Sequence, residues 1–360
     1  MGRRVCVYAI CRNEEKFVDR WMDSMAEADI IVVTDTGSAD GTVEKLRARG
    51  AQVYEETVDP WRFDAARNLS LSHVPEDADI CVCTDLDEVF APGWRAALER
   101  VWTDDTRQAR YLYIWSLRPD GTPDVQFNYF KAHARAGFSW RHPVHEVLVY
   151  AGDAPPRTAY APGMVLTHLP DPEKPRASYL ALLELAVEEA PESDRCAHYL
   201  GREYFFRGMW DDAVRELRRH LCLKSATWPE ERCASMRLLA QAEHSRGNDR
   251  AAYQWFFRAV AELPGMREPY VEFARLAEDL SDWPLALFMA EEALKITEKS
   301  SSYVNMGYAW DFTPHDIAAV AAYWLGSSAH ARAHAEEAVL LAPEDERLRK
   351  NLEIIRSRVS

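Results

Sequence analysis

Residues 80–88 read ICVCTDLDE, a short apolar run that ends in three acidic side chains. Apolar runs of this length without alternation are typical of strands buried on both faces, as in a parallel sheet. Ligands of open parallel sheets bind outside the carboxyl ends of the strands. The stretch therefore predicts an α/β fold and places the candidate site at the acidic end of this strand.

The chain before this stretch alternates strand-like and helix-like segments. Strand patterns cover residues 5–11, 29–34 and 51–55. Helical patterns cover residues 43–49 and 63–71. A further helical segment has Val18, Trp21, Met22 and Met25 on one face. Such alternation predicts a mostly parallel, Rossmann-like sheet with helices on both faces.

The chain after this stretch changes character. Residues 111–117 and 125–132 read as a hairpin around Pro119-Asp120-Gly121, appended to the parallel sheet. Six prolines then accumulate over residues 151–175, and we interpret that segment as a linker or an ordered crossover. The α/β domain is therefore expected to span residues 1–150.

Residues 176–360 read as helical throughout and contain similar units. Each unit has a small or polar loop position between two helices, at Gly208, Gly247, Asp282 and Ser327. Helix pairs that recur at periods of about 34 residues are typical of tetratricopeptide arrays, here irregular. The alternative is a helical bundle without true repeats.

Composition excludes several classes of protein. The 360 residues carry a formal net charge of -15 at pH 7, which disfavours binding to nucleic acid or to an anionic membrane. No run approaches the roughly 20 apolar residues of a membrane-spanning helix, and the N-terminus does not resemble a signal peptide. The seven cysteines include no CxxC pair, which predicts reduced core residues of a cytoplasmic protein rather than a zinc site.

Asp85 and Asp87 are the first candidate ligands. In an extended chain, alternate side chains share a side, so both carboxylates would point at one place. Carboxylate oxygens suit a hard divalent cation that keeps positions for substrate phosphates. The alternative is a solvated acidic pair at a strand end.

Two further segments lie near the same edge of the predicted sheet. Residues 35–42 (DTGSADGT) either cap the next helix or let Asp35 accept hydrogen bonds from a nucleotide, and the two roles are compatible. Arg67 would pair there with a phosphate or a carboxylate, or else form a surface salt bridge.

The segment 140–146 (WRHPVHE) offers a metal ligand and a base. His145 would complete the metal shell, and Glu146 would act as the general base, with His142 as its competitor. In an extended segment Glu146 would face away from a metal on His145 unless the chain turns at Pro143 or after His145. A solvated glutamate, or one that orients His145, is the alternative.

The motifs CRNEE, VTDTGSADGT, FDAARN, CTDLDE and FSWRHPVHE occur here in the order of family 2 glycosyltransferases of the GT-A fold. The chain resembles that family over about residues 4–150, and its helical half resembles the tetratricopeptide-containing branch. The resemblance implies a nucleotide-diphosphate sugar donor, a divalent cation on the DxD motif, and inversion at the anomeric carbon.

Carried to this sequence, the resemblance implies a role for each matching side chain. Arg12, Glu14, Asp35, Asp64 and Arg67 would surround the nucleoside, Asp85 would touch ribose or metal, and Asp87 and His145 would hold the metal. Trp140 would offer an aromatic face to the sugar ring.

We therefore expect a cytoplasmic hexosyltransferase that uses a UDP-sugar or another nucleotide-sugar with Mn²⁺ or Mg²⁺. A protein or peptide acceptor is favoured because tetratricopeptide arrays present binding surfaces to polypeptides. The helical half also predicts a homodimer contact. The alternatives are a transferase for cell-surface or lipopolysaccharide glycans, and an inactive interaction scaffold.

Overall fold

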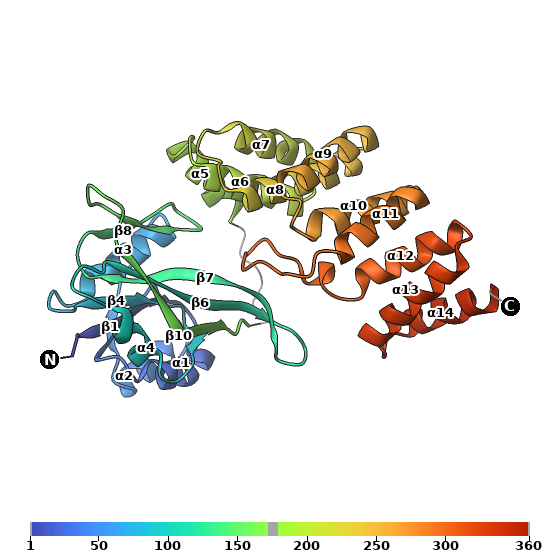
Figure 1. The fold of residues 1–360 in the computed structure, drawn as a ribbon. Helices are drawn as coiled ribbons and strands as arrows, with labels where there is room; N and C mark the ends of the chain where they lie inside the picture. The colour runs from blue at the N-terminus through green and yellow to red at the C-terminus, as the bar shows by residue number, and fades with distance from the viewer. Residues whose placement is uncertain (1, 172–178, 359–360) are drawn as a thin grey trace. The chain divides into compact units, whose positions relative to one another are not determined.

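The computed structural model describes residues 2–171 and 179–358. The chain divides into an N-terminal unit, residues 1–186, and a C-terminal unit, residues 187–360 (Figure 1). Each unit is described by itself below.

The N-terminal unit is built on an eight-stranded sheet in the order β3-β2-β1-β4-β7-β6-β10-β5. Its strands are β1 (Val5–Cys11), β2 (Ile30–Asp35), β3 (Gln52–Glu55), β4 (Ile80–Cys83), β5 (Glu88–Phe90), β6 (Gln108–Leu117), β7 (Pro123–Ala134) and β10 (Thr158–His168). Strands β1 to β4 are parallel, as are β6 and β10, whereas β7 and β5 run antiparallel to their neighbours. The prediction of a mostly parallel α/β sheet is confirmed.

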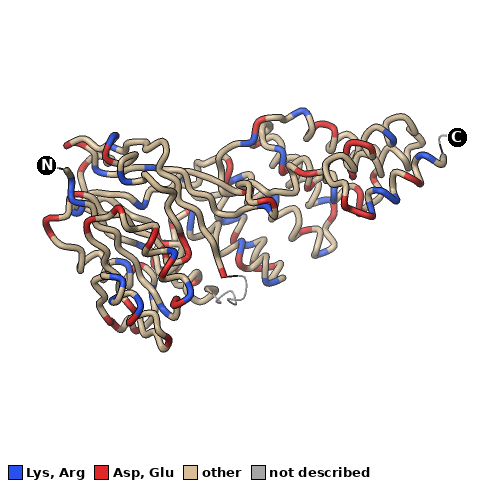
Figure 2. The backbone as a smooth tube through the Cα atoms, turned by 90° about the horizontal axis from the view of Figure 1, so that it is seen from below, with Lys and Arg blue, Asp and Glu red and all other residues tan. Residues whose placement is uncertain are grey.

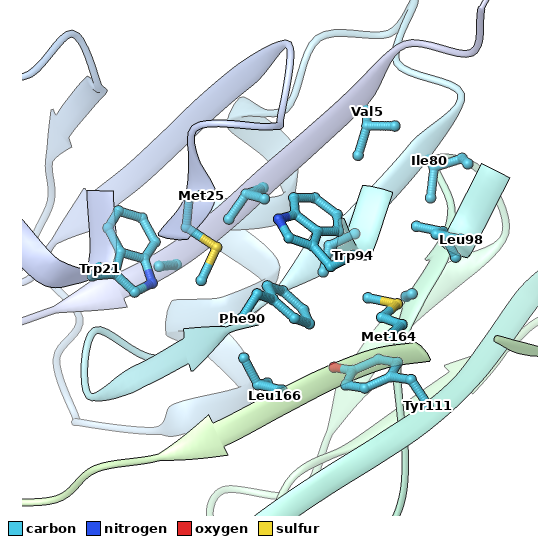
Figure 3. Packing of buried hydrophobic residues seen from close by; sticks show 14 of the residues in the cluster. Val5, Trp21, Met25, Ile80, Phe90, Trp94, Leu98, Tyr111, Met164 and Leu166 are labelled. Atoms are coloured by element: carbon cyan, nitrogen blue, oxygen red, sulfur yellow. The ribbon is translucent and has the colours of Figure 1, made fainter. Parts of the chain in front are cut away.

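Helices cover both faces of this sheet because its central strands bury both sets of side chains. Val5 and Val7 of β1 share a core with α1 (Val18–Met25), α2 (Thr42–Ala48) and α4 (Trp94–Val101). Cys6 and Tyr8 face a second core with α3 (Phe63–His73). Trp21, Phe90 and Trp94 are large side chains of the first core (Figure 3).

The hairpin of β6 and β7 is confirmed, but the expected domain end at 150 differs from the structure. Residues 158–168 form β10 between β6 and β5, so the middle of the Pro-rich segment belongs to the sheet. The prolines hid this strand because Pro162 lies where the β10–β6 register shifts, a bulge position that tolerates proline. Residues 172–175 of the expected linker lie outside the described residues. A small second sheet pairs β8 (Phe138–Arg141) with β9 (Val147–Tyr150).

The C-terminal unit consists of helix hairpins. After α5 (Leu180–Glu189), which crosses the unit boundary, the helices are α6 (Asp194–Phe206), α7 (Trp210–Cys222), α8 (Pro229–Ser245), α9 (Asp249–Glu262), α10 (Glu268–Asp279), α11 (Trp283–Leu294), α12 (Thr313–Trp324), α13 (Ser328–Leu341) and α14 (Glu346–Arg358). The predicted loop positions join α6 to α7, α8 to α9, α10 to α11 and α12 to α13. Gly208, Gly247, Ser281 and Gly326 adopt positive φ in these loops, so the hairpins share one turn geometry. The unit is a tetratricopeptide-like array.

Charged residues of both signs are interspersed along both units (Figure 2). Among the described residues, no helix has the length and apolar character needed to cross a membrane.

Candidate functional site

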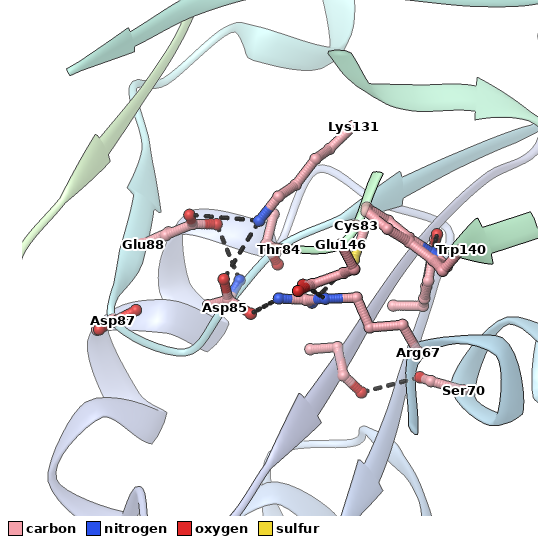
Figure 4. Close-up of polar contacts among 12 residues, drawn as sticks. Arg67, Ser70, Cys83, Thr84, Asp85, Asp87, Glu88, Lys131, Trp140 and Glu146 are labelled. Carbon is pink, nitrogen blue, oxygen red and sulfur yellow. Dashed lines mark hydrogen bonds and ion pairs between the residues drawn. The ribbon is translucent and has the colours of Figure 1, made fainter. Parts of the chain in front are cut away.

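The two aspartates after β4 do not share one side of an extended chain. The chain turns at Leu86 and Asp87, and the Glu88 N–H donates to the Asp85 carbonyl at 3.0 Å. The turn sends the two carboxylates to different partners, and Figure 4 shows Asp87 apart from the ion pairs of Asp85. The expectation of two carboxylates on one side was wrong, because alternation requires an extended backbone.

Asp85 lies between two buried cations. Arg67 Nη2 donates to Asp85 Oδ1 at 2.8 Å, and Lys131 Nζ donates to Asp85 Oδ2 at 3.2 Å. Burial would raise the pKa of Asp85, but the charges of Arg67 and Lys131 outweigh it and hold that pKa well below its usual range. The side chain of Asp85 is 34% exposed, against 6% for Arg67 and 5% for Lys131. A ligand can therefore reach Asp85, while the cations lie behind it.

Lys131 also anchors the chain beneath the site. Its Nζ lies 3.7 Å from Glu88 Oε1, and Glu88 accepts hydrogen bonds from the Asp85 N–H at 2.8 Å and from the Tyr113 hydroxyl at 2.7 Å. Burial raises the pKa of Glu88, a rise that Lys131 opposes. The sequence analysis missed Lys131, although a lysine in the aromatic strand segment NYFKAHA was a usable signal.

Arg67 joins Asp85 to Glu146. Its Nε donates to Glu146 Oε1, and its Nη1 donates to Cys83 Sγ at 3.3 Å (Figure 4). Arg67 is therefore no surface salt bridge and makes its contacts inside the protein. Burial would lower its pKa, but Asp85 and Glu146 raise it, so the guanidinium stays charged.

Trp140 is part of the core. It is 4% exposed, and its Nε1 donates to the Tyr8 hydroxyl at 2.9 Å. Its backbone pairs with the side chain of Asn68, which ties β8 to α3. The expectation that Trp140 faces a sugar ring was therefore wrong.

His168 is the histidine that lies next to Asp87. Strand β10 pairs antiparallel with β5 and sets His168 opposite Glu88. His168 Nε2 lies 3.3 Å from Asp87 Oδ2, and its Nδ1 lies 3.1 Å from the Trp115 carbonyl oxygen. Burial would lower the pKa of His168, but Asp87 outweighs it and raises that pKa. We expected His145 beside Asp87; His168 was missed because its segment was interpreted as a linker.

An exposed aromatic ring lies against this pair. The rings of Trp115 and His168 are stacked, with centroids 4.5 Å apart, and Trp115 is 48% exposed. Trp115, rather than Trp140, offers an aromatic face next to the carboxylates.

The loops after β1 and β2 are tied together. Asp35 is buried and accepts hydrogen bonds from the N–H groups of Gly37 and Ser38, at 3.0 and 2.9 Å. The Asn13 N–H donates to Ser38 Oγ, and the Glu14 N–H donates to Thr42 Oγ1. Asp35 therefore shapes the loop, as a turn residue does, while Arg12 stays exposed at the end of β1.

Asp64 and the segment after β8 complete the set of predicted side chains. Asp64 is buried and forms an ion pair with Arg62 at 2.9 Å.

The chain does turn after β8, because His142 and His145 both have positive φ, 79° and 50°. The objection that Glu146 must face away from the site therefore does not apply.

Acidic and imidazole side chains lie here at the strand ends of an open α/β sheet, where such sheets bind their ligands. Residues 6–144 match the family model of glycosyl transferase family 2. The N-terminal unit thus contains a family 2 glycosyltransferase domain, and a tetratricopeptide-like unit follows it in the sequence.

Solved structures similar to parts of the chain fall into two groups. Glucosyl-3-phosphoglycerate synthase from Mycobacterium tuberculosis, in complex with Mn²⁺, UDP and phosphoglyceric acid, is 25% identical, with a TM-score of 0.27 over 31% of this chain and 44% of that one. MamA is 14% identical, with a TM-score of 0.37 over 46% of this chain and 81% of its own. Yeast Tom70 is 17% identical, with a TM-score of 0.39 over 52% of this chain and 37% of its own.

Proposed function

We propose that this chain is a metal-dependent, inverting glycosyltransferase that moves a hexose-type sugar from a UDP-type donor to a protein or peptide. The observation that carries the proposal is the pairing of Asp87 with His168 at the strand end where Asp85 is paired with Arg67 and Lys131. It supports a nucleotide-diphosphate site because this edge of the sheet then holds two side chains that can bind a cation, Asp87 and His168. It also holds the partly exposed carboxylate of Asp85, which a bound nucleotide can reach.

The donor atoms at this edge fit a divalent cation such as Mn²⁺ or Mg²⁺. Asp87 supplies a carboxylate oxygen and His168 an imidazole nitrogen, a set that leaves positions for diphosphate oxygens. The cation would replace the proton on His168 Nε2. The Nδ1–H would still donate its hydrogen bond to the Trp115 carbonyl oxygen and hold the ring in its orientation. When bound, the cation would stabilise the charge that develops on the leaving diphosphate. His168 takes the role that we first gave to His145.

The remaining roles follow the resemblance to family 2 glycosyltransferases. We propose that Asp85 contacts the ribose or the cation, and that Arg12, Glu14, Asp35 and Asp64 line the nucleoside side of the site. Arg67 and Lys131 hold Asp85 in place and keep it charged. Trp115 offers its exposed face to the sugar or to the acceptor.

Glu146 is better suited to position Arg67 than to act as the base. Its Oε1 accepts a hydrogen bond from the Arg67 guanidinium, so this oxygen is occupied and not directed at an acceptor. We therefore propose His142 as the base that takes the acceptor proton as the acceptor attacks the anomeric carbon and the diphosphate leaves.

Glu146→Gln separates the two roles, because it keeps the shape and removes the charge. As a positioning residue, Glu146→Gln should weaken donor binding about 10-fold and leave the pH profile of kcat unchanged. His142→Gln should lower kcat about 10²-fold or more at an unchanged donor Kd. A loss of about 10²-fold in kcat for Glu146→Gln, with normal donor binding, would return the base to Glu146.

A peptide acceptor is proposed because helix-hairpin arrays bind extended polypeptides along their stacked helices. The same unit would carry a homodimer contact, which light scattering of the full chain checks. We propose a cytoplasmic location because the cysteines are scattered and include no CxxC pair, as in reduced proteins, and cell fractionation tests it.

The experiment that tests this function is a thermal-shift screen of nucleotide-sugars with Mn²⁺, Mg²⁺ or EDTA. A UDP-sugar with Mn²⁺ should raise the Tm by several degrees by mass action, and EDTA should abolish the shift. The labelled sugar of that donor is then offered to peptides and to glycans. Label in glycans would reassign the acceptor, and the absence of any donor shift and hydrolysis would favour the inactive scaffold.

A further inference from the structure

The C-terminal unit contains a cluster of potential ligands where three helices meet. Asp194 is the first residue of α6, His220 lies in the last turn of α7, and Glu231 lies in the first turn of α8. One ligand atom from each of these side chains lies within 4.8 Å of the other two. None of the three has a part in the glycosyl transfer proposed above.

The polar atoms of this cluster are incompletely satisfied. His220 is fully buried, and its Nε2 has no hydrogen-bond partner among the described residues. Glu231 Oε1 lies 3.6 Å from this nitrogen, within the range of an ion pair but beyond a normal hydrogen bond. Glu231 is itself 4% exposed. Glu231 Oε2 accepts a hydrogen bond from the Tyr303 hydroxyl, so the space between His220 Nε2 and Glu231 Oε1 is the place for a third partner.

The other ring nitrogen of His220 is already oriented as in metal sites. His220 Nδ1 lies 2.9 Å from Ser235 Oγ, which lies 2.7 Å from His198 Nδ1. If His220 Nδ1–H donates to Ser235 and the Ser235 hydroxyl donates to His198, the free lone pair of His220 is on Nε2. Histidines that bind metal donate their second N–H to such a partner, which fixes the tautomer and the ring.

We propose that Asp194, His220 and Glu231 bind a zinc-type divalent cation that joins the ends of α6, α7 and α8. One imidazole and two carboxylates suit Zn²⁺ with a water molecule as the fourth ligand. Ligand bonds of about 2.1 Å require ligand atoms about 3.4 Å apart, so the half-buried Asp194 closes toward the other two. The cation replaces the missing partner of His220 and stabilises the first hairpins of the array.

The test measures zinc in the full chain without nucleotide. Asp87→Asn serves as the background, because it removes the cation site proposed in the N-terminal unit. After dialysis against Zn²⁺, mass spectrometry of the metal should find one zinc per chain in Asp87→Asn and none in Asp87→Asn with Asp194→Asn. Asp194 is half-buried at a helix start, so Asp194→Asn should keep the circular dichroism of the parent. Cys222→Ser in the same background is the matched control for an exposed thiol and should keep the zinc.

A second measurement identifies the ligands. Zinc-edge X-ray absorption of Asp87→Asn should show nitrogen and oxygen neighbours without sulfur, and Zn²⁺ should raise the Tm by several degrees only when Asp194 is present. Zinc retained by the Asp194→Asn variant, sulfur in the shell, or no bound zinc would each overturn the proposal. The last result would identify His220 and Glu231 as a plain buried ion pair. None of these outcomes depends on glycosyl transfer.

Discussion

Asp87→Asn should lower donor hydrolysis and sugar transfer by about 10²–10³-fold, the loss expected when one electrostatic stabiliser of a developing charge is removed. The substitution keeps the size of the side chain but removes the charge that would hold the cation opposite His168. Asp87 is a half-exposed turn residue, so the Tm should stay within about 1 °C of the parent. Initial rates with Mn²⁺, beside Asp105→Asn as a control at an exposed aspartate of the same unit, measure the effect.

Substitutions of His168 and of His145 test which of the two histidines binds the cation with Asp87. His168→Gln should reproduce the loss of Asp87→Asn, and combining the two should add little because both remove one cation. His145→Gln should leave the apparent affinity for Mn²⁺ near that of the parent. The reverse result, with His145→Gln losing Mn²⁺ and His168→Gln keeping it, would restore the ligand expected from sequence.

Arg67→Met should destabilise the N-terminal unit by about 3–5 kcal/mol, as breaking a buried ion pair from one side does. The substitution removes the ion pair of Glu146 with Arg67. It also leaves Lys131 as the remaining cation of the two that pair with Asp85. We expect the Tm to fall by roughly 6–20 °C, because each kcal/mol lowers the Tm of a unit of this size by about 2–4 °C. Donor binding should fail as well, since Asp85 loses its position.

Two variants serve as controls for Arg67→Met. Arg67→Lys keeps the charge but cannot hold two carboxylates with one planar group, so it should recover only part of the stability. Arg47→Met removes an exposed pair with Glu55 and should cost less than about 1 kcal/mol. A Tm for Arg67→Met equal to that of Arg47→Met would contradict the role given to Arg67.

The fold could be predicted where periodicity is local. The apolar runs at residues 5–11 and 80–83 and the helical loops at Gly208 and Gly247 carry their own signals, and the structure confirms them. Strand β10 could not be predicted, because its bulge contains Pro162 and its pairing with β5 and β6 is set by distant segments.

The site could be predicted in composition but not in geometry. The acidic residues after β4 were found, yet the turn at Leu86 that separates Asp85 from Asp87 has no glycine or proline to mark it. Arg67 was expected near a ligand, and its burial depends on Glu146, which lies 79 residues later in the chain. Such contacts follow from tertiary packing, which periodicity does not report.

The most direct test of the central claim is an anomalous difference map from crystals of the full chain grown with MnCl₂ and UDP. We predict one manganese peak within bonding distance of Asp87 and His168, with the UDP diphosphate on its open side and Asp85 still paired with Arg67. UDP bound at this edge without manganese, or manganese bound there by residues other than Asp87 and His168, would contradict the account.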